Sequence, residues 1–238
     1  MSAYQQLAAN LTTRLNLDIP PVALAFAAAP PPGVVRSSDA VPSACAFWRA
    51  AEKGVFFADA ASHYNCPVGS MVMGFNLPDA VSQELMGLVG KMTACGYISG
   101  DEPARIPVNG KPAEGIVYGP LAEFPMPPDV VLLWLKPAQA MIWSEASGGA
   151  DWSCGTPTAV FGRPACAAIP AAMGGAQPTM SLGCVGMRTF TGIGDDRMLA
   201  VLPGDRLDAF VAAVATSRSV NDAMGEFYEG RKRVTGSV

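Results

Sequence analysis

The feature that most restricts the fold of this chain is a block of sequence that occurs twice in the same order. Each copy opens with consecutive prolines and an apolar run, at residues 20–26 and again at residues 127–135. Each copy then carries the pattern Cys-Ala-x3-Ala-Ala-x2-Gly, followed by a second cysteine and a glycine. These cysteines are Cys45 and Cys66 in the first copy and Cys166 and Cys184 in the second. The repeat predicts two degenerate halves that pack about a pseudo-twofold axis.

Local patterns predict alternating helices and strands. Residues 2–5 form a capping box followed by apolar residues at helical spacing, so we expect a helix up to about residue 17. Expected strands cover residues 22–26, 55–58, 115–118, 129–135, 179–183 and 198–202. Expected helices cover residues 45–53, 79–94, 138–146 and 205–216, with a short one from Cys166, turns after Cys66 and Cys184, and a partly helical tail beyond Val220.

These elements predict an α/β (α+β) fold in a single domain over residues 1–238. The repeat halves are expected at about residues 18–102 and 125–220. Between them, residues 103–128 are rich in proline and glycine, which is typical of a connector.

The composition indicates which partners and which compartment to expect. Charged residues make up 15% of the chain, the net charge is −4, and the only dense basic run is at residues 231–233, so we expect no nucleic-acid partner. No stretch approaches the ~18 apolar residues of a membrane helix, and the N-terminus lacks a secretory signal pattern. We therefore expect a cytoplasmic protein with no membrane partner. Low charge and a mean hydropathy of +0.26 favour a homo-oligomer.

Six cysteines in a reducing compartment indicate metal ligation, redox chemistry or packing rather than structural disulfides. Four of them, Cys45, Cys66, Cys166 and Cys184, lie at the ends of predicted elements. A thiol at a helix N-terminus meets the positive end of the helix dipole, which favours the thiolate. Four thiolates match an iron-sulfur cluster, with 4Fe-4S favoured, in a chain that has one histidine. The leading interpretation is therefore a cluster protein in electron transfer or anaerobic redox chemistry, with a redox partner protein.

Two other interpretations stay open from the residues alone. Each half's cysteine pair could cycle between dithiol and disulfide without a metal, as in a thiol oxidoreductase. Alternatively, buried cysteines could surround a noncatalytic cleft for a small molecule or a tetrapyrrole, with Met71, Met73 and Met187 as apolar walls. Because no C-x2-C spacing is present, a four-thiol centre would have to be assembled by the fold.

Three further residues, His63, Arg188 and Cys154, are candidates for the same site, and Cys95 is not. His63, three residues before Cys66, could ligate or tune a bound centre. Arg188 could bind an anionic ligand or balance cluster charge, and a surface salt bridge explains it equally well. Cys95 is expected to pack at a helix end, and Cys154, in a glycine-rich loop, is a candidate extra ligand or exposed thiol.

Five segments of the chain together resemble the family called domain of unknown function 169. They are LDIPPVALAF at 17–26, CAFWRAAEKG at 45–54, HYNCPVGSMVMGF at 63–75, the stretch from GRPAC to GIGDD at 162–196, and LPG at 202–204. That family occurs in bacteria and archaea, often in anaerobes, and its cysteine-containing blocks coincide with the four repeat cysteines. The resemblance spans nearly the whole chain, and it implies one intact domain and the importance of these blocks rather than a particular reaction.

Overall fold

Two apolar strands, β1 (Val22–Ala27) and β4 (Val130–Leu135), pair antiparallel at the centre of a sheet in the computed structural model, which describes residues 2–37, 40–111, 113–148 and 158–235. Seven strands line up in the order β2-β3-β1-β4-β7-β6-β5, and only the β5–β6 pair is parallel. The other strands are β2 (Phe56–Asp59), β3 (Gly115–Pro120), β5 (Ala159–Phe161), β6 (Thr179–Ser181) and β7 (Met198–Pro203). The expected mixed α/β fold is thus confirmed.

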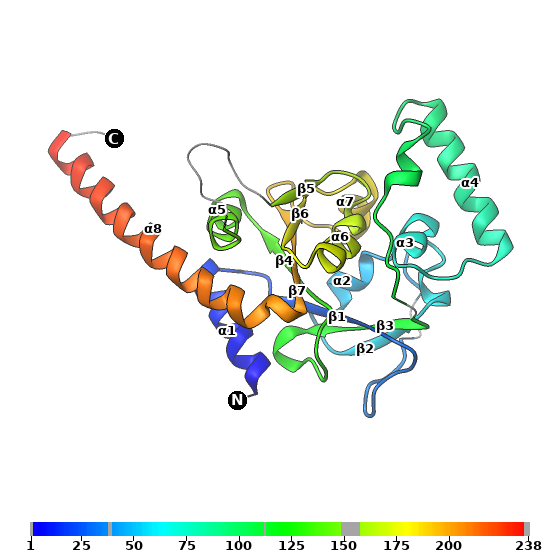
Figure 1. Ribbon diagram of the computed structural model, residues 1–238, viewed down its shortest axis with the longest axis horizontal. Helices are drawn as coiled ribbons and strands as arrows, with labels where there is room; N and C mark the ends of the chain where they lie inside the picture. The colour runs from blue at the N-terminus through cyan, green and yellow to red at the C-terminus, as the bar shows by residue number, and fades with distance from the viewer. Residues whose placement is uncertain (1, 38–39, 112, 149–157, 236–238) are drawn as a thin grey trace.

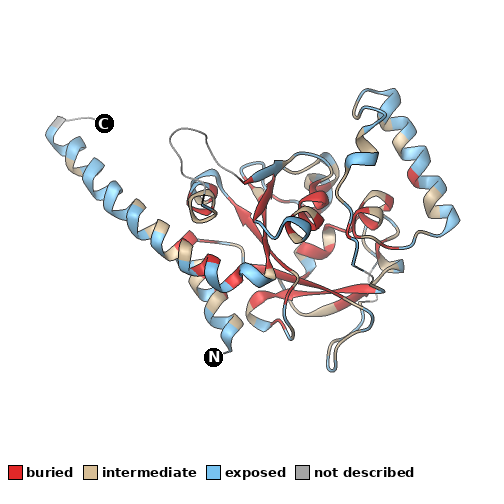
Figure 2. Ribbon diagram, viewed as in Figure 1, coloured by how far each residue is buried: buried red, intermediate tan, exposed pale blue. Residues whose placement is uncertain are grey.

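Both faces of the sheet are buried, because alternate residues of each central strand enter two different cores. In β4, Val130, Leu132 and Trp134 enter one core, while the residues between them enter the other. The same alternation holds in β1, where Leu24 and Ala23 point to opposite faces. The sheet is therefore the middle layer of three, with helices on both sides (Figures 1 and 2).

One face is covered by the first and last helices together with α5. The helices on this face are α1 (Ala3–Leu15), α5 (Pro137–Ala146) and α8 (Leu207–Thr235), which pack against one another. The capping box predicted at the N-terminus is present, since the Ser2 side chain accepts from the Gln5 N–H and the Gln5 side chain accepts from the Ser2 N–H. None of the helices in the described part of the chain combines the length and apolar character needed to cross a membrane.

The opposite face is covered by short helices that carry the repeat cysteines. These helices are α2 (Ala46–Ala50), α3 (Pro67–Val72), α6 (Ala168–Gly175) and α7 (Val185–Thr191). A fifth helix, α4 (Asp79–Ala94), packs on α3 and buries only Leu85. Single 3-10 turns are η1 (Ala61–His63), η2 (Glu102–Arg105), η3 (Leu121–Glu123), η4 (Ala165–Ala167) and η5 (Gly204–Arg206).

The Asp129 side chain adds a hydrogen bond between the two central strands, beyond the residues that pair in register. The pairing of β1 with β4 ends at Leu24 and Val130, so the next N–H of β1 on that side needs another acceptor. The Asp129 carboxylate accepts it from Phe26 at 2.7 Å and also accepts from Lys111 Nζ at 2.6 Å. The residue before β4 therefore ties β1 and the segment before β3 to the centre of the sheet.

The strand order is compatible with the repeat expected from the sequence. Reading outward from the centre, β3 and β2 follow β1, while β7 and β6 follow β4. The joints match as well, since the Leu121 N–H donates to Pro21 O at 2.9 Å and the Gly204 N–H donates to Asp129 O at 2.8 Å. The expected halves at 18–102 and 125–220 leave out β3, which pairs with β1 along its whole length. The two-half interpretation stays a hypothesis, and its first half would have to be extended to include β3.

Several local predictions of secondary structure were wrong, because tertiary packing rather than local sequence determines these segments. The turns expected after Cys66 and Cys184 are the helices α3 and α7, which the core supports despite their glycines. The helix expected over 45–53 is only the five-residue α2. The final helix, expected to end near 216, continues to Thr235.

We predict that Gly204→Ala destabilises the protein by about 3 kcal/mol. A Cβ at Gly204 would lie 1.7 Å from the carbonyl oxygen of Pro128, so the joint between β4 and β7 would have to shift. Urea unfolding followed by circular dichroism measures the change. As a control, Gly87→Ala, where a Cβ meets nothing within 4 Å, should stabilise α4 by up to ~1 kcal/mol. Equal stability of Gly204→Ala and wild type would contradict the prediction.

Candidate cysteine centre

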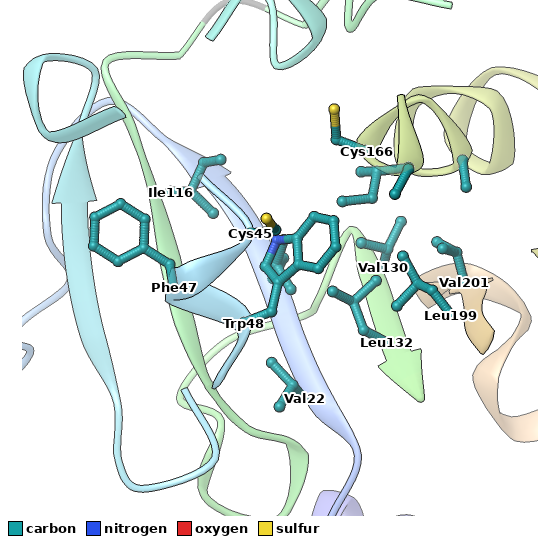
Figure 3. Packing of buried hydrophobic residues seen from close by; sticks show 14 of the residues in the cluster. Val22, Cys45, Phe47, Trp48, Ile116, Val130, Leu132, Cys166, Leu199 and Val201 are labelled. Atoms are coloured by element: carbon teal, nitrogen blue, oxygen red, sulfur yellow. The ribbon is translucent and has the colours of Figure 1, made fainter. Parts of the chain in front are cut away.

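All four repeat cysteines lie at the beginning of helices on the same face of the sheet. Cys45, Cys66 and Cys184 are the N-cap residues of α2, α3 and α7. Cys166 lies in η4, the 3-10 turn that leads into α6. Figure 3 shows Cys45 and Cys166 within one apolar cluster, each coming from a different half of the sequence.

The helices that carry these cysteines pack across the two halves. In the first contact α2, which follows Cys45, packs against α7, which follows Cys184. In the second contact α3, which follows Cys66, packs against η4, which contains Cys166. The sequence left open whether the four cysteines meet at one centre or form a pair within each half; in the fold, the elements that carry them have neighbours from opposite halves.

Burial and mutual repulsion dominate the electrostatics of the centre. Cys45 and Cys166 are each 8% exposed, and Cys66 and Cys184 are half-buried. Burial raises the pKa of the Cys45 thiol to about 12, and nearby Cys66 and Cys184 also raise it. Burial raises the pKa of Cys166 well above its usual range, with Cys66, Cys184 and Cys45 adding to the rise. Cys66 and Cys184 therefore raise the pKa of both buried thiols, and Cys45 also raises the pKa of Cys166.

The sequence argument that helix dipoles would favour thiolates fails at the two buried positions. Desolvation of a thiolate outweighs a dipole effect limited to one helical turn, and α2 is only five residues long. In the absence of a bound cation, Cys45 and Cys166 are therefore protonated thiols at neutral pH. A metal centre would reverse this, because thiolates lose their protons on binding metal.

Hydrogen bonds position two of the sulfurs, and close packing positions a third. The Ser43 hydroxyl and Cys45 Sγ are 3.0 Å apart, and the Met187 N–H donates to Cys184 Sγ at 3.4 Å. A Cβ at Gly69 would lie 3.0 Å from Cys66 Sγ and 2.9 Å from Ala44 Cβ, so Cys66 is set against the residue before Cys45. A larger residue at Gly69 would therefore disturb the centre directly.

His63 is buried and engaged at both ring nitrogens. Nδ1 donates to Asp59 O at 2.7 Å, and Nε2 accepts from the Tyr118 hydroxyl at 2.9 Å. Burial lowers the pKa of His63 to about 4, so the ring is neutral at pH 7. As placed, His63 has no free nitrogen for a metal. Its carbonyl accepts from the Cys66 N–H and from Ser70 Oγ, so it positions Cys66 through the backbone.

Tyr118 is a residue of this region that the sequence argument missed. It is fully buried on β3, and its pKa is raised well above the usual range by burial and by Cys45 and Cys166. Its hydroxyl is bonded to His63, and Tyr118 belongs to the same core cluster as Cys45 and Cys166. The available signal was a lone phenol in the apolar run IVYG, because a buried tyrosine hydroxyl needs a partner.

Arg188 supports the loop that follows α7 rather than facing an open site. Its guanidinium donates to three carbonyl oxygens, those of Leu182, Gly194 and Arg197, at 2.6, 3.1 and 3.0 Å. A long ion pair with Asp195, at 3.9 Å, is exposed on the carboxylate side. The residue therefore braces the backbone on either side of α7, and the anion-binding role stays a prediction without support from these contacts.

The remaining sulfur atoms lie apart from the centre or within the core. Cys95 was expected to pack, but it is exposed at the end of α4, where its thiol donates to Met92 O at 3.4 Å. Cys154 lies outside the described residues. Met73 and Met187 are core residues at 1% exposure rather than cleft walls, and Met71 is half-buried.

A surface cavity lies away from the four cysteines. It measures about 480 Å³ and opens beside β2 and the end of α2, lined by residues that include Val41, Phe47, Lys53 and Phe56. None of the four repeat cysteines lines it. Within the described ranges, no three His, Cys, Asp or Glu side chains lie close enough to hold a single metal ion.

We predict a graded reactivity of the thiols in metal-free, reduced protein. Only the thiolate reacts with iodoacetamide, so the raised pKa and burial of Cys45 and Cys166 should delay their alkylation until the chain unfolds. The exposed Cys95 should be modified first at pH 7.5. Peptide mass spectrometry over time reads out the order, and rapid labelling of Cys45 or Cys166 in folded protein would contradict this picture.

We also predict acid destabilisation through His63. Unfolded chains bind a proton at the ordinary histidine pKa near 6.5, but the folded chain binds it only near pH 4, so the free energy of unfolding falls as the pH drops through this window. The loss is about 3 kcal/mol in full. Urea unfolding at pH 7 and pH 4.5 should show a smaller loss for His63→Gln than for wild type. The same pH dependence in both would rule out His63 as the cause.

Comparison with known proteins places the cysteine blocks in a family context. No curated protein and no solved structure shows significant similarity to the chain. The model of one family, DUF169, described as "Uncharacterised ArCR", matches residues 10–213. This match includes all four repeat cysteines, all seven strands and the helices around the centre. The chain therefore belongs to the DUF169 family.

Proposed function

We propose that this protein binds a cysteine-ligated iron-sulfur cluster, of the 4Fe-4S type, and serves in electron transfer or anaerobic redox chemistry. The observation that supports the proposal is the convergence of Cys45, Cys66, Cys166 and Cys184 from both halves of the chain onto one face of the sheet. Four thiols without a competing imidazole form the donor set that such clusters take.

Two features of the four cysteines bear on the kind of centre that they would hold. No set of three potential ligands in the described chain is tight enough for one ion, and a four-iron cube spreads its thiolate ligands farther apart than one ion does. Two sulfurs already have hydrogen-bonding neighbours, Ser43 at Cys45 and the Met187 N–H at Cys184. Hydrogen bonds to cluster sulfurs and burial are the protein's means of setting a reduction potential.

When bound, an iron-sulfur cluster supplies one-electron transfer. The chain's own residues would then have separate tasks. Cys45 and Cys166 would hold the cluster from the buried side, where Phe47 and Ile169 of the same cluster of core residues would exclude water. Cys66 and Cys184 would hold it from the half-exposed side, where a redox partner protein would have to approach. This proposal includes a reducing, cytoplasmic setting, in which free thiols persist.

The two alternatives draw less support from the contacts. A thiol oxidoreductase needs an accessible thiolate, and the raised pKa values of Cys45 and Cys166 oppose one at those positions. A tetrapyrrole needs a cleft beside the cysteines, whereas the cavity of about 480 Å³ lies near β2 and two of the expected wall methionines are in the core. Both remain measurable outcomes of the experiment below.

The test is anaerobic purification and reconstitution of the full chain, with iron and acid-labile sulfide assays. We expect about four irons per chain and a broad absorption near ~400 nm. Cys66→Ser and Cys184→Ser, at the half-buried positions, should each remove most of the iron while the far-ultraviolet circular dichroism stays unchanged. Cys95→Ser is the matched control and should bind as much iron as wild type.

Three results would count against the proposal. Less than about half an iron per chain after reconstitution would exclude the cluster. Full iron content in the Cys66→Ser/Cys184→Ser double variant would exclude the ligand assignment. A sharp Soret band on the protein as isolated would replace the cluster with a tetrapyrrole.

A further inference from the structure

A buried indole N–H close to Cys45 has no hydrogen-bond partner. Trp48, the third residue of α2, is 1% exposed, and its Nε1 has no acceptor among the residues that the structure describes. A tryptophan N–H that is buried usually finds an acceptor, because an unpaired buried donor costs free energy. The Nε1 of Trp48 therefore needs a specific explanation.

The neighbouring polar aromatic side chains of the same core cluster do have partners. The ring centroid of Trp134 lies 6.2 Å from that of Trp48, and the Trp134 side chain makes a hydrogen bond with Glu52. The Tyr118 hydroxyl donates to His63 at 2.9 Å. In the described part of this core, Trp48 is thus a polar aromatic residue whose donor is left unused.

Trp48 shares a helical face with Cys45. Its backbone N–H donates to Cys45 O at 3.1 Å, so the two residues are one helical turn apart and their side chains project from the same face. Both side chains belong to the core cluster that also contains Cys166. Figure 3 shows the indole nitrogen on the side of the ring next to Cys45. The unused donor is therefore turned toward the cysteine centre.

The two copies of the repeated sequence differ at this position. Trp48 follows Cys45 by three residues, and Ile169 follows Cys166 by the same interval. Both residues are buried in the same cluster. Because an aliphatic side chain fills the corresponding position in the second copy, packing in this core does not by itself require an indole N–H.

The acceptor strength of Cys45 depends on whether its sulfur carries a charge. A protonated thiol is a weak acceptor, whereas an anionic sulfur accepts a strong, charge-assisted hydrogen bond. Without a bound metal Cys45 is a thiol, with its sulfur 3.0 Å from the Ser43 hydroxyl. Ligation to a metal removes the proton and leaves a thiolate sulfur.

We propose that the Nε1–H of Trp48 donates to the thiolate sulfur of Cys45 when Cys45 binds the cluster, and that this hydrogen bond raises the reduction potential. This inference rests on the proposed function and gives Trp48 a positioning and tuning role within it. Reduction adds negative charge to the centre, so a donor to a ligating sulfur stabilises the reduced state. Loss of the donor therefore lowers the potential, whereas entry of water through a packing defect would raise it.

A redox titration of the reconstituted full chain tests the sign of this effect. Trp48→Phe keeps an aromatic ring and removes the N–H, so it should bind as much iron as wild type. We expect it to shift the reduction equilibrium about tenfold toward the oxidised form, a fall of ~59 mV in a one-electron potential. Trp48→Ile, which copies the residue of the second repeat, should lower the potential in the same direction.

Trp143 offers a matched control in the opposite core. It is fully buried, and its Nε1 also has no partner in the described part of the chain. Trp143→Phe removes the same kind of group on the far side of the sheet from the cysteines. It should leave the reduction potential at the wild-type value.

Isotope labelling tests the hydrogen bond itself. Protein with ¹⁵N in its tryptophan indoles is reconstituted and reduced, and pulsed electron paramagnetic resonance detects a ¹⁵N nucleus coupled to the cluster spin. Wild type and Trp143→Phe should show this coupling, and Trp48→Phe and Trp48→Ile should lack it. The measurement on wild type needs no variant, so it decides even where a substitution impairs folding.

The outcomes separate this inference from the proposed function. An unchanged or higher potential in Trp48→Phe, or a labelled wild type that binds its cluster without ¹⁵N coupling, would overturn the role of Trp48 and leave the cluster assignment standing. A wild type that takes up no iron would overturn both, and the iron assay shows this before any variant is measured.

Discussion

The antiparallel contact between β1 and β4 is the interaction on which the rest of the structure depends. It is short, with three residue pairs in register, and the Asp129 carboxylate extends it by accepting the Phe26 N–H. Every other strand reaches the centre through one of these two. Because β1 and β4 come from different halves of the chain, this contact also decides that helices from different halves meet above it, α2 with α7 and α3 with η4.

Much of the framework could be predicted from the sequence, because its elements have strong local signals. Short apolar runs rich in β-branched and aromatic residues, such as VVLLWL in β4, favour a buried strand, and the Ser2–Gln5 capping box fixes the start of α1 by local hydrogen bonds. The elements that prediction missed are those stabilised from a distance. Cys66-Pro67 looks like a turn locally, but proline suits the first position of a helix, and the core supports the short helix that follows.

The same distinction between local and long-range determinants applies to the candidate site. The identity of the four cysteines followed from their recurrence, and their placement on one face is compatible with it. Their pKa values did not follow, because burial depends on the whole fold while the dipole argument considers one helix at a time. His63 was chosen for its nearness to Cys66 in sequence, yet the phenol that occupies its ring nitrogen lies 55 residues away on β3. The spacing of residues near His63 in the sequence does not predict a partner so far away along the chain.

The assembly of the cysteine region from both halves of the chain has a consequence for synthesis. The ribosome delivers Cys45 and Cys66 well before residues 166–184, and the contacts of α2 with α7 and of α3 with η4 form only after the second half has emerged. During that interval the two early thiols have none of their later neighbours and are open to solvent and oxidants. The nascent chain is thus more vulnerable at these positions than the finished protein, in which Cys45 is 8% exposed.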